Sequence, residues 1–471
     1  FSGSMERMTE QEKKPVSGRA TNPNSPEFMK FISGGWAEEK AELPKRVEVA
    51  EFAAKRRTAV AEAFPGKLIV IEAGGTQVRS NDTEYRYRPH TAFAHLTGWG
   101  AATVPDSILV IDARAHAHHS QLFFRPTAGR NTEEFFTNTM IGEFWVGPRP
   151  GLESVEALLG IETQDLADFD DLISNLPDDL VIRLDNAELK QFVDELRLVK
   201  DAYEIEQMRG AVEASVNGFN DVLRALPWAM AHERGERVVE SAFFARARMD
   251  GNDLGYETIA ASGSHACILH WIQNDGPVVP GDLLLLDAGV ELESLYTADV
   301  TRTIPVTGHF NPTQRKVYEA VLEAADAAFA IAKPGVLFRE LHEAAMEVIA
   351  KKMIEWGFID ITLEEALAGD RQLHRRWMVH GTSHHLGMDV HDCDTARREM
   401  YREAPLREGM IFTIEPGLYF QPDDLRVPEE FRGIGVRIED DVLVTANGVE
   451  NLTAALPRHP DDVEAWIASA S

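Results

Sequence analysis

Short apolar runs bounded by polar or turn-forming residues predict the secondary structure in the first part of the chain. The runs at 67–72, 107–112 and 121–125 predict buried strands, and the charged, Ala-rich stretch 48–64 predicts a helix. Strands that alternate with helical stretches are typical of an α/β domain. We therefore expect an N-terminal α/β domain over residues 30–190.

The second part of the chain opens with a long helical pattern. Apolar residues recur at helical spacing across 195–225, and two further helices are predicted at 313–332 and 338–355. The apolar positions of the first helix are Ile205, Met208, Val212, Val216, Phe219 and Leu223. A second domain is accordingly expected over residues 191–456.

Strand-like stretches lie between and after these helices, at 282–293, 299–306, 410–420 and 433–445. In the last of them the residues alternate, so that Arg437 and Glu439 share one face of the strand. Carboxylates placed at this period in apolar strands are predicted to point into a common polar cavity, lined by a curved sheet.

The two ends of the chain carry no such pattern. Residues 1–29 are expected to form a flexible extension, in which residues 1–4 have the character of an expression scar. Residues 457–471 are expected to form a C-terminal tail without recognisable chemistry.

Composition narrows the classes of partner and compartment. A formal net charge of −30 over 471 residues argues against a nucleic acid or an anionic membrane as partner. The two cysteines, Cys267 and Cys393, indicate no disulfide framework, which favours a cytoplasmic protein. No apolar run approaches the ~18 residues that a membrane span needs.

Five potential metal ligands are spread over the second domain, each in an apolar stretch punctuated by glycine. They are Asp287, Asp299, His384, Glu415 and Glu439. Four carboxylates and one imidazole are costly in a core, but they suit two divalent cations with an activated water between them. The oxygen-rich set favours Mn²⁺, while Zn²⁺ and Co²⁺ remain possible.

Simpler interpretations compete with this one. Asp287 and Asp299 could be solvated caps at strand ends, since Asp is usually exposed. Asp440 and Asp441 could be a solvated strand end in the same way. Residues 380–391 contain four histidines among glycines, which favours chemistry over an ordinary structural role.

Several of these segments, in order, closely resemble the pita-bread metallopeptidases, and specifically the aminopeptidase P (Xaa-Pro aminopeptidase) family. The resemblance covers most of the chain. The segments that carry it are 81–88, 96–98, 194–206, 287–289, 299–303, 380–387, 413–417 and 433–441. It implies an N-terminal domain of the creatinase/prolidase type, followed by an α+β pita-bread catalytic domain.

By this resemblance, the five residues named above bind two metal ions, and Glu415 is also the general base and proton shuttle. His391 matches the histidine that stabilises the oxyanion, and His270 matches one that contacts the substrate near the scissile bond. His380 matches a residue that lines the proline pocket.

The resemblance extends to residues around these groups. Arg437 and Tyr419 match neighbours that orient Glu439 and the product side of the site. The family also suggests a homodimer or homotetramer, in which Asp82 reaches a substrate bound by an adjacent subunit. One departure is that Asp287 and Asp299 are twelve positions apart, one more than in the family pattern. The extra residue is expected in the turn within 290–295, or as a bulge.

The predicted function is hydrolysis of the bond between an N-terminal residue and a following proline, by attack of a hydroxide that bridges two metal ions. The predicted partners are peptides with proline at the second position. A prolidase restricted to Xaa-Pro dipeptides is the first alternative, and a non-metallic relative, creatinase-like or peptide-binding, is the second. A methionine aminopeptidase would not need the domain at 30–190.

Overall fold

The computed structural model describes residues 25–37, 42–115 and 117–470. The chain divides into two compact units, and each is described by itself. The first comprises Phe1–Gly98 and Thr103–Arg183, and the second comprises Trp99–Ala102 and Leu184–Ser471. Most of the extension predicted at 1–29 lies outside the described residues, but Pro26–Ser33 forms helix α1.

The first unit is built on a five-stranded mixed sheet, in the order β6-β5-β4-β1-β7. These strands are β1 Leu68–Glu72, β4 Ile108–Asp112, β5 His119–Phe124, β6 Glu162–Asp165 and β7 Val181–Ile182. The strands predicted at 67–72, 107–112 and 121–125 are confirmed as β1, β4 and β5. Their apolar side chains are buried, because alternate residues of each strand pack beneath the covering helices.

The other elements of this unit are short, apart from α2. The helices are α2 Val49–Ala63, α3 Thr91–Thr97, α4 Glu133–Thr137, α5 Glu143–Val146, α6 Leu152–Leu159 and α7 Phe169–Ile173, and a small hairpin pairs β2 Val78–Ser80 with β3 Thr83–Glu84. The α/β character predicted for this domain is therefore confirmed.

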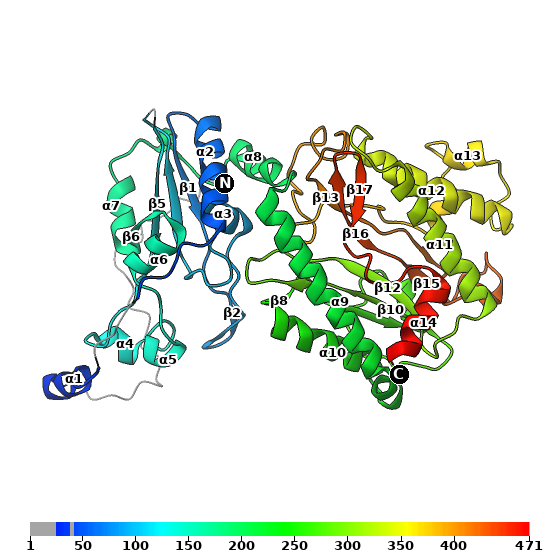
Figure 1. Ribbon diagram of the computed structural model, residues 1–471, viewed down its shortest axis with the longest axis horizontal. Helices are drawn as coiled ribbons and strands as arrows, with labels where there is room; N and C mark the ends of the chain where they lie inside the picture. The colour runs from blue at the N-terminus through cyan, green and yellow to red at the C-terminus, as the bar shows by residue number, and fades with distance from the viewer. Residues whose placement is uncertain (1–24, 38–41, 116, 471) are drawn as a thin grey trace, which may run out of the picture. The chain divides into compact units, whose positions relative to one another are not determined.

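The second unit surrounds short, curved sheets with two helix pairs (Figure 1). The helices are α8 Ala187–Arg197, α9 Ala202–Ala231, α10 Gly235–Asp250, α11 Pro312–Ile331, α12 Phe338–Glu355, α13 Leu363–Leu367 and α14 Pro460–Ala470. Helix α9 packs on α10, and α11 packs on α12. The predicted helices at 313–332 and 338–355 are confirmed as α11 and α12.

The strands of this unit fall into four small sheets, with the orders β12-β10-β9, β11-β8, β13-β16-β17 and β14-β15. They are β8 Asp253–Leu254, β9 Ile259–Ser262, β10 Leu283–Ala288, β11 Val290–Glu291, β12 Val300–Pro305, β13 Ile411–Ile414, β14 Gly417–Tyr419, β15 Gly435–Arg437, β16 Asp440–Thr445 and β17 Gly448–Asn451. A single bridge between Thr301 and Glu439 brings β12 beside the start of β16.

The predicted strands are interrupted where the site residues lie. The stretch 433–445 is two strands in different sheets, with a break at Ile438 and Glu439. The stretch 410–420 breaks at Glu415 and Pro416, since proline lacks the N–H that a continuous ladder requires. These breaks let a strand pass from one sheet to the next.

The helix predicted at 195–225 is also two helices, α8 and α9. The chain leaves the helix after Arg197 and re-enters it at Ala202, where Asp201 caps the new helix. The side chain of Asp201 accepts from the N–H of Glu204, and the Glu204 carboxylate accepts from the N–H of Asp201. This reciprocal capping box satisfies helix donors locally, which stabilises the restart.

The C-terminal segment is part of the second unit. Helix α14 buries Val463 and Ile467, and the Arg302 guanidinium donates to the carbonyl oxygens of Leu456 and Pro457. Residues predicted to be a tail therefore add to the core around β12. The boundary between the units, at Arg183 and Leu184, falls earlier than the predicted one.

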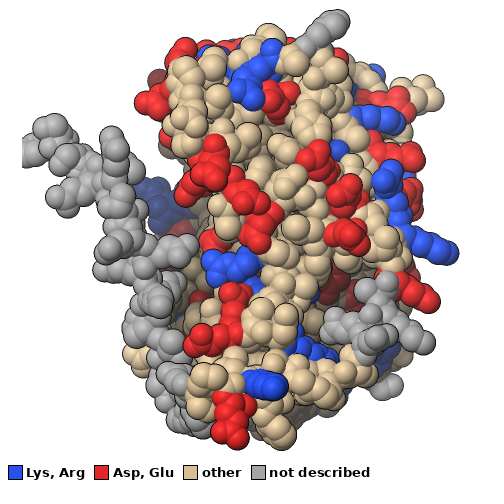
Figure 2. Space-filling model, turned by 90° about the vertical axis from the view of Figure 1, so that its left-hand side faces the viewer, with Lys and Arg blue, Asp and Glu red and all other residues tan. Residues whose placement is uncertain are grey.

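On the face drawn in Figure 2, Asp and Glu side chains are spread among uncharged residues, with fewer Lys and Arg interspersed. This distribution agrees with the net charge of −30. Within the ranges that the structure describes, no helix combines the length and apolarity needed to cross a membrane.

Candidate metal centre

The hairpin of β10 and β12 positions the first two candidate ligands. Its strands are antiparallel, and Asp287 is paired with Thr301. The connecting turn bends at Leu292–Tyr296, where Leu295 adopts a left-handed φ of 71°. Asp299 directly precedes β12, and its N–H donates to Oδ2 of Asp441 at 3.2 Å. This bend overlaps the region 290–295 in which the extra residue is expected.

Three of the predicted ligands converge in the second unit. Asp299, His384 and Glu439 each offer one ligand atom, and these atoms lie within 4.8 Å of one another. Glu415 joins them, because Nε2 of His384 lies 3.3 Å from Oδ2 of Asp299 and 3.4 Å from Oε1 of Glu415. Residues from four separate segments therefore meet at one point.

Asp287, the fifth candidate, is held by two donors beside this group. Tyr256 donates to its Oδ1 at 2.7 Å, and Arg437 donates to its Oδ2. Asp287 is 7% exposed and Asp299 4% exposed. The alternative that these two aspartates are solvated strand caps is therefore wrong.

Burial and mutual repulsion perturb the carboxyl groups. Burial, with a contribution from the charge of Asp299, raises the pKa of Glu439 well above its usual range. Burial likewise raises the pKa of Glu415 to about 7, although the charge of His384 opposes the shift. A divalent cation would relieve both the desolvation and the repulsion.

The pKa of His384 is raised as well, because the neighbouring carboxylates favour its protonated form. Burial alone would lower its pKa, but the hydrogen bond to Asp299 and the charges of Glu415 and Asp299 outweigh burial and raise the pKa to about 9. Its Nδ1 lies 3.1 Å from the carbonyl oxygen of His385. Because a carbonyl only accepts, Nδ1 carries the proton, and Nε2 is the atom that faces the carboxylates.

A chain of hydrogen bonds runs behind the ligands. The Arg437 guanidinium donates to Tyr419 Oη at 3.1 Å and to Thr301 Oγ1 at 3.1 Å. Thr301 in turn donates to Oε2 of Glu439 at 2.7 Å. Nε2 of His380 lies 2.8 Å from Tyr419 Oη, and burial lowers the pKa of His380 to about 3, so this ring is neutral.

Of the remaining predicted residues, His391 and His270 lie near this group, and Asp82 lies elsewhere. His391 is exposed, and its ring stands edge-on to that of His384 at a centroid distance of 4.4 Å. His270 is exposed as well and is close enough to influence the pKa of both His380 and His391. Asp82 lies in the first unit, in the turn between β2 and β3.

Three residues near the centre were not predicted from the sequence. Tyr256 and Thr301 each bond to a candidate ligand, and Asp441 accepts from the backbone of Asp299. Thr301 shares a strand face with Asp299 at period 2, so the sequence held a signal for it. Tyr256 carries no such signal. Asp440 and Asp441 are both fully buried, so the solvated strand end considered for them is wrong.

The donor set fits divalent cations that prefer oxygen. The four carboxylates lie in β10, directly before β12, directly after β13 and between β15 and β16, and the imidazole lies in the loop before β13. A cluster of this kind is suited to hydrolysis with an activated water.

Comparison with known protein families gives two matches. The model described as "Metallopeptidase family M24" matches residues 206–446, and "Aminopeptidase P, N-terminal domain" matches residues 53–180. Together they cover the cores of both units.

Curated relatives and solved structures agree with these matches. Xaa-Pro aminopeptidase 1 of Streptomyces coelicolor is 45% identical, with 94% of this chain and 92% of that protein covered. Xaa-Pro aminopeptidase 2 of the same organism is 46% identical, with 94% and 96% covered. The structure of Escherichia coli aminopeptidase P with the inhibitor Pro-Leu has a TM-score of 0.79 at 29% identity, covering 90% of this chain and 99% of that one.

Proposed function

The chain belongs to the M24 metallopeptidases, in the aminopeptidase P family of Xaa-Pro aminopeptidases, and from that premise we propose that it removes an N-terminal residue preceding proline with two divalent metal ions. The observation that carries the proposal is the convergence of Asp299, His384, Glu415 and Glu439 beside Asp287. All five residues expected from the family pattern are present.

In this proposal Asp287, Asp299, His384, Glu415 and Glu439 hold the two ions. When bound, the ions polarise the scissile carbonyl and lower the pKa of a water molecule so that it can attack. Mn²⁺ is the proposed ion, because most donors are hard oxygens. A structure described as Zn-substituted E. coli aminopeptidase P in complex with product, with a TM-score of 0.78, supports Zn²⁺ as an alternative ion.

The protein groups supply the proton transfers and the orientation of the substrate. Glu415 accepts the proton from the attacking water and delivers it to the proline nitrogen as the peptide bond breaks. In the metal-free centre burial raises its pKa to about 7, and a carboxylate placed beside the attacking water can accept a proton and pass it on. His391 and His270 are proposed to donate to the developing oxyanion and to the substrate, because both are exposed and lie near the centre.

Proline selection is assigned to His380 and Tyr419. A peptide bond before proline has no N–H, and the ring is rigid, so a site that offers ring contacts without a backbone acceptor favours it. We assign the ring contact to neutral His380, whose Nε2 lies 2.8 Å from Tyr419 Oη. A prolidase would share these groups, so peptide length is what separates the two functions.

The proposed assembly is a homodimer or homotetramer, with Asp82 contributing to a substrate site of an adjacent copy. An apolar surface in the first unit supports association. Phe31, Phe144 and Trp145 are exposed by 81%, 65% and 41%, and they border a cavity of about 620 Å³. Sedimentation velocity would test the assembly: a monomer at micromolar concentration contradicts it. We also propose a cytoplasmic location, supported by two buried free cysteines.

Peptide hydrolysis after metal exchange tests the function directly. The protein is stripped with a chelator and supplied with Mn²⁺, then incubated with an Xaa-Pro-Xaa tripeptide, an Xaa-Pro dipeptide and an Xaa-Ala-Xaa control. We expect metal-dependent release of the first residue from the proline tripeptide, with or without cleavage of the dipeptide, and no cleavage of the Xaa-Ala-Xaa control. Cleavage of the dipeptide only would indicate a prolidase. Full activity without metal would support a non-metallic relative and would contradict the proposal.

A further inference from the structure

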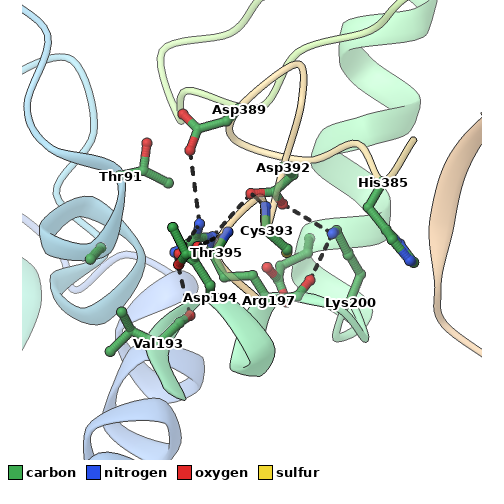
Figure 3. Close-up of polar contacts among 12 residues, drawn as sticks. Thr91, Val193, Asp194, Arg197, Lys200, His385, Asp389, Asp392, Cys393 and Thr395 are labelled. Carbon is green, nitrogen blue, oxygen red and sulfur yellow. Dashed lines mark hydrogen bonds and ion pairs between the residues drawn. The ribbon is translucent and has the colours of Figure 1, made fainter. Parts of the chain in front are cut away.

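A buried charge cluster, which contains none of the candidate ligands, lies at the break between α8 and α9 (Figure 3). Arg197 Nε donates to Oδ1 of Asp392 at 3.1 Å, and Lys200 Nζ donates to Oδ2 of the same carboxylate at 3.1 Å. Lys200 Nζ also donates to the carbonyl oxygen of Arg197 at 2.6 Å. We call Arg197, Lys200 and Asp392 the anchor cluster.

The anchor cluster is taken almost completely out of water. Arg197 and Lys200 are each 3% exposed, and Asp392 is 1% exposed. Burial would raise the pKa of Asp392, but the charges of Lys200 and Arg197 outweigh it and hold the pKa well below its usual range. The three charged groups therefore depend on one another. Removal of any one of them would leave an uncompensated charge in the interior, which is strongly destabilising.

The cluster ties the start of the second unit to the loop at 389–397. Arg197 Nη2 donates to Oδ1 of Asp194 at 2.7 Å, and Oδ2 of Asp194 accepts from the N–H and hydroxyl of Thr395. The N–H of Lys200 donates to the carbonyl oxygen of Gly409 at 2.9 Å. Arg197, at the end of α8, and Lys200, in the break that follows it, bond to the same carboxylate.

A short path leads from the anchor cluster to the metal centre. The N–H of Asp392 donates to the carbonyl oxygen of His385 at 2.9 Å. The same oxygen accepts from Nδ1 of His384 at 3.1 Å, which directs Nε2 of His384 toward Asp299 and Glu415. In Figure 3 the side chain of His385 points away from the cluster, where it stacks on Phe338.

Close packing makes this path stiff. A Cβ on Gly387 would lie 2.3 Å from Oδ2 of Asp392 and 3.1 Å from Nζ of Lys200, so only glycine fits here. The carbonyl oxygen of Gly387 accepts from the N–H of Thr297 at 3.0 Å, two residues before Asp299. Asp392 is also the direct neighbour of His391.

We propose that Asp392, held by Arg197 and Lys200, is a positioning residue that fixes the His385 carbonyl and thereby the ring of His384 and the placement of His391. The inference deepens the proposed function, since it concerns the same centre. Mutation of groups that orient a metal-binding histidine typically lowers metal affinity or activity by about 10- to 100-fold. A cluster that only stabilised the fold would change neither in the folded protein.

The test uses the full chain with three variants. Asp392→Asn keeps the shape but sets an amide N–H₂ or a neutral oxygen against Lys200. Lys200→Met removes one donor and leaves the pair of Arg197 with Asp392. The double variant, Asp392→Asn with Lys200→Met, removes the ammonium group that the new amide would face. It keeps one hydrogen bond to Arg197. Val239→Ala, in the core between α9 and α10, is the control for loss of stability alone.

We expect Asp392→Asn to lower Mn²⁺ affinity and kcat at saturating metal by at least about tenfold per folded molecule. The double variant should recover part of both losses, because its remaining carbonyl oxygen still accepts from Arg197. If Asp392→Asn does not fold, Lys200→Met should show a smaller loss of the same kind.

Two results would overturn the inference. One is a lower melting temperature for Asp392→Asn or Lys200→Met with wild-type Mn²⁺ affinity and kcat per folded molecule, as expected for Val239→Ala. The other is a double variant that recovers melting temperature while affinity and kcat stay at the level of Asp392→Asn. Because metal affinity is measured by titration without substrate, the test remains decisive if the proposed peptide substrate is wrong.

Discussion

Arg437 donates a hydrogen bond through Nη2 to the Oδ2 of Asp287, and both side chains are buried. Burial raises the pKa of Asp287, and the charge of Arg437 opposes the shift. The guanidinium is planar and also reaches Tyr419 and Thr301, so one side chain orients groups on both sides of the centre.

Replacement of Arg437 by Lys should therefore weaken metal binding and catalysis, although the positive charge is retained. Arg437 bonds to Thr301, Tyr419 and Asp287 through three different nitrogens, and the single nitrogen of a lysine cannot reproduce that spacing. We expect kcat/KM to fall about 10- to 100-fold, with weaker Mn²⁺ binding, measured by steady-state kinetics and metal titration. Arg209→Lys, at the bidentate pair with Glu450, is the matched control and should change neither. Equal effects of the two substitutions would contradict the role of Arg437.

The hydroxyl of Tyr256 can be removed without changing the ring. Tyr256→Phe deletes the donor to Asp287 Oδ1, a single hydrogen bond worth about 1 kcal/mol or somewhat more, since its acceptor is charged. We expect Mn²⁺ affinity to fall by about 3- to 10-fold, as measured by titration calorimetry. Tyr318→Phe, which removes a buried hydroxyl bonded to the Arg458 carbonyl, should lower stability but leave metal affinity unchanged.

The sequence carried enough information to predict several elements of each unit. Apolar runs marked β1, β4 and β5, and helical periodicity marked α11 and α12. The convergence of Asp299, His384 and Glu439 could be anticipated because charged residues in apolar stretches need partners.

Other features depend on long-range contacts that no local pattern encodes. The periodicity of 195–225 continues through the break between α8 and α9, because both helices bury one face. The break is favoured by the partners of Arg197 and Lys200, of which Asp392 is distant in sequence. Likewise, Asp440 is buried because Arg302 donates to it, and an acidic run alone cannot reveal that partner.

Metal binding should release protons and strengthen with pH. The pKa values of His384, about 9, and Glu415, about 7, mean that the metal-free centre holds protons at pH 7. Both groups must lose them to bind a cation, so affinity should rise from pH 6 to pH 8, by about tenfold per pH unit for each proton displaced. Calorimetry in two buffers of different ionisation enthalpy measures the release. Affinity that does not change over this range would contradict the assignment.

Asp424 should make folding stability depend on acid pH. The Arg376 guanidinium bonded to Asp424 lowers the carboxyl pKa to about 2, and Trp377 Nε1 donates to the same group. Because the folded pKa lies below the unfolded value of about 3.9, the stabilisation is complete above pH 4 and is lost as the pH falls toward 2.

The corresponding variant is Asp424→Asn. It should lower the free energy of unfolding at pH 7 by about 1 kcal/mol, a value reduced because the Arg376 side chain is 49% exposed. Urea unfolding at pH 7, 5 and 3.5 should show the difference from wild type shrinking at the lowest pH. Glu347→Gln, at an exposed pair with Lys351 on α12, is the control and should show no such trend. A difference that grows on acidification would mean that the Asp424 carboxyl is not stabilised in its charged form.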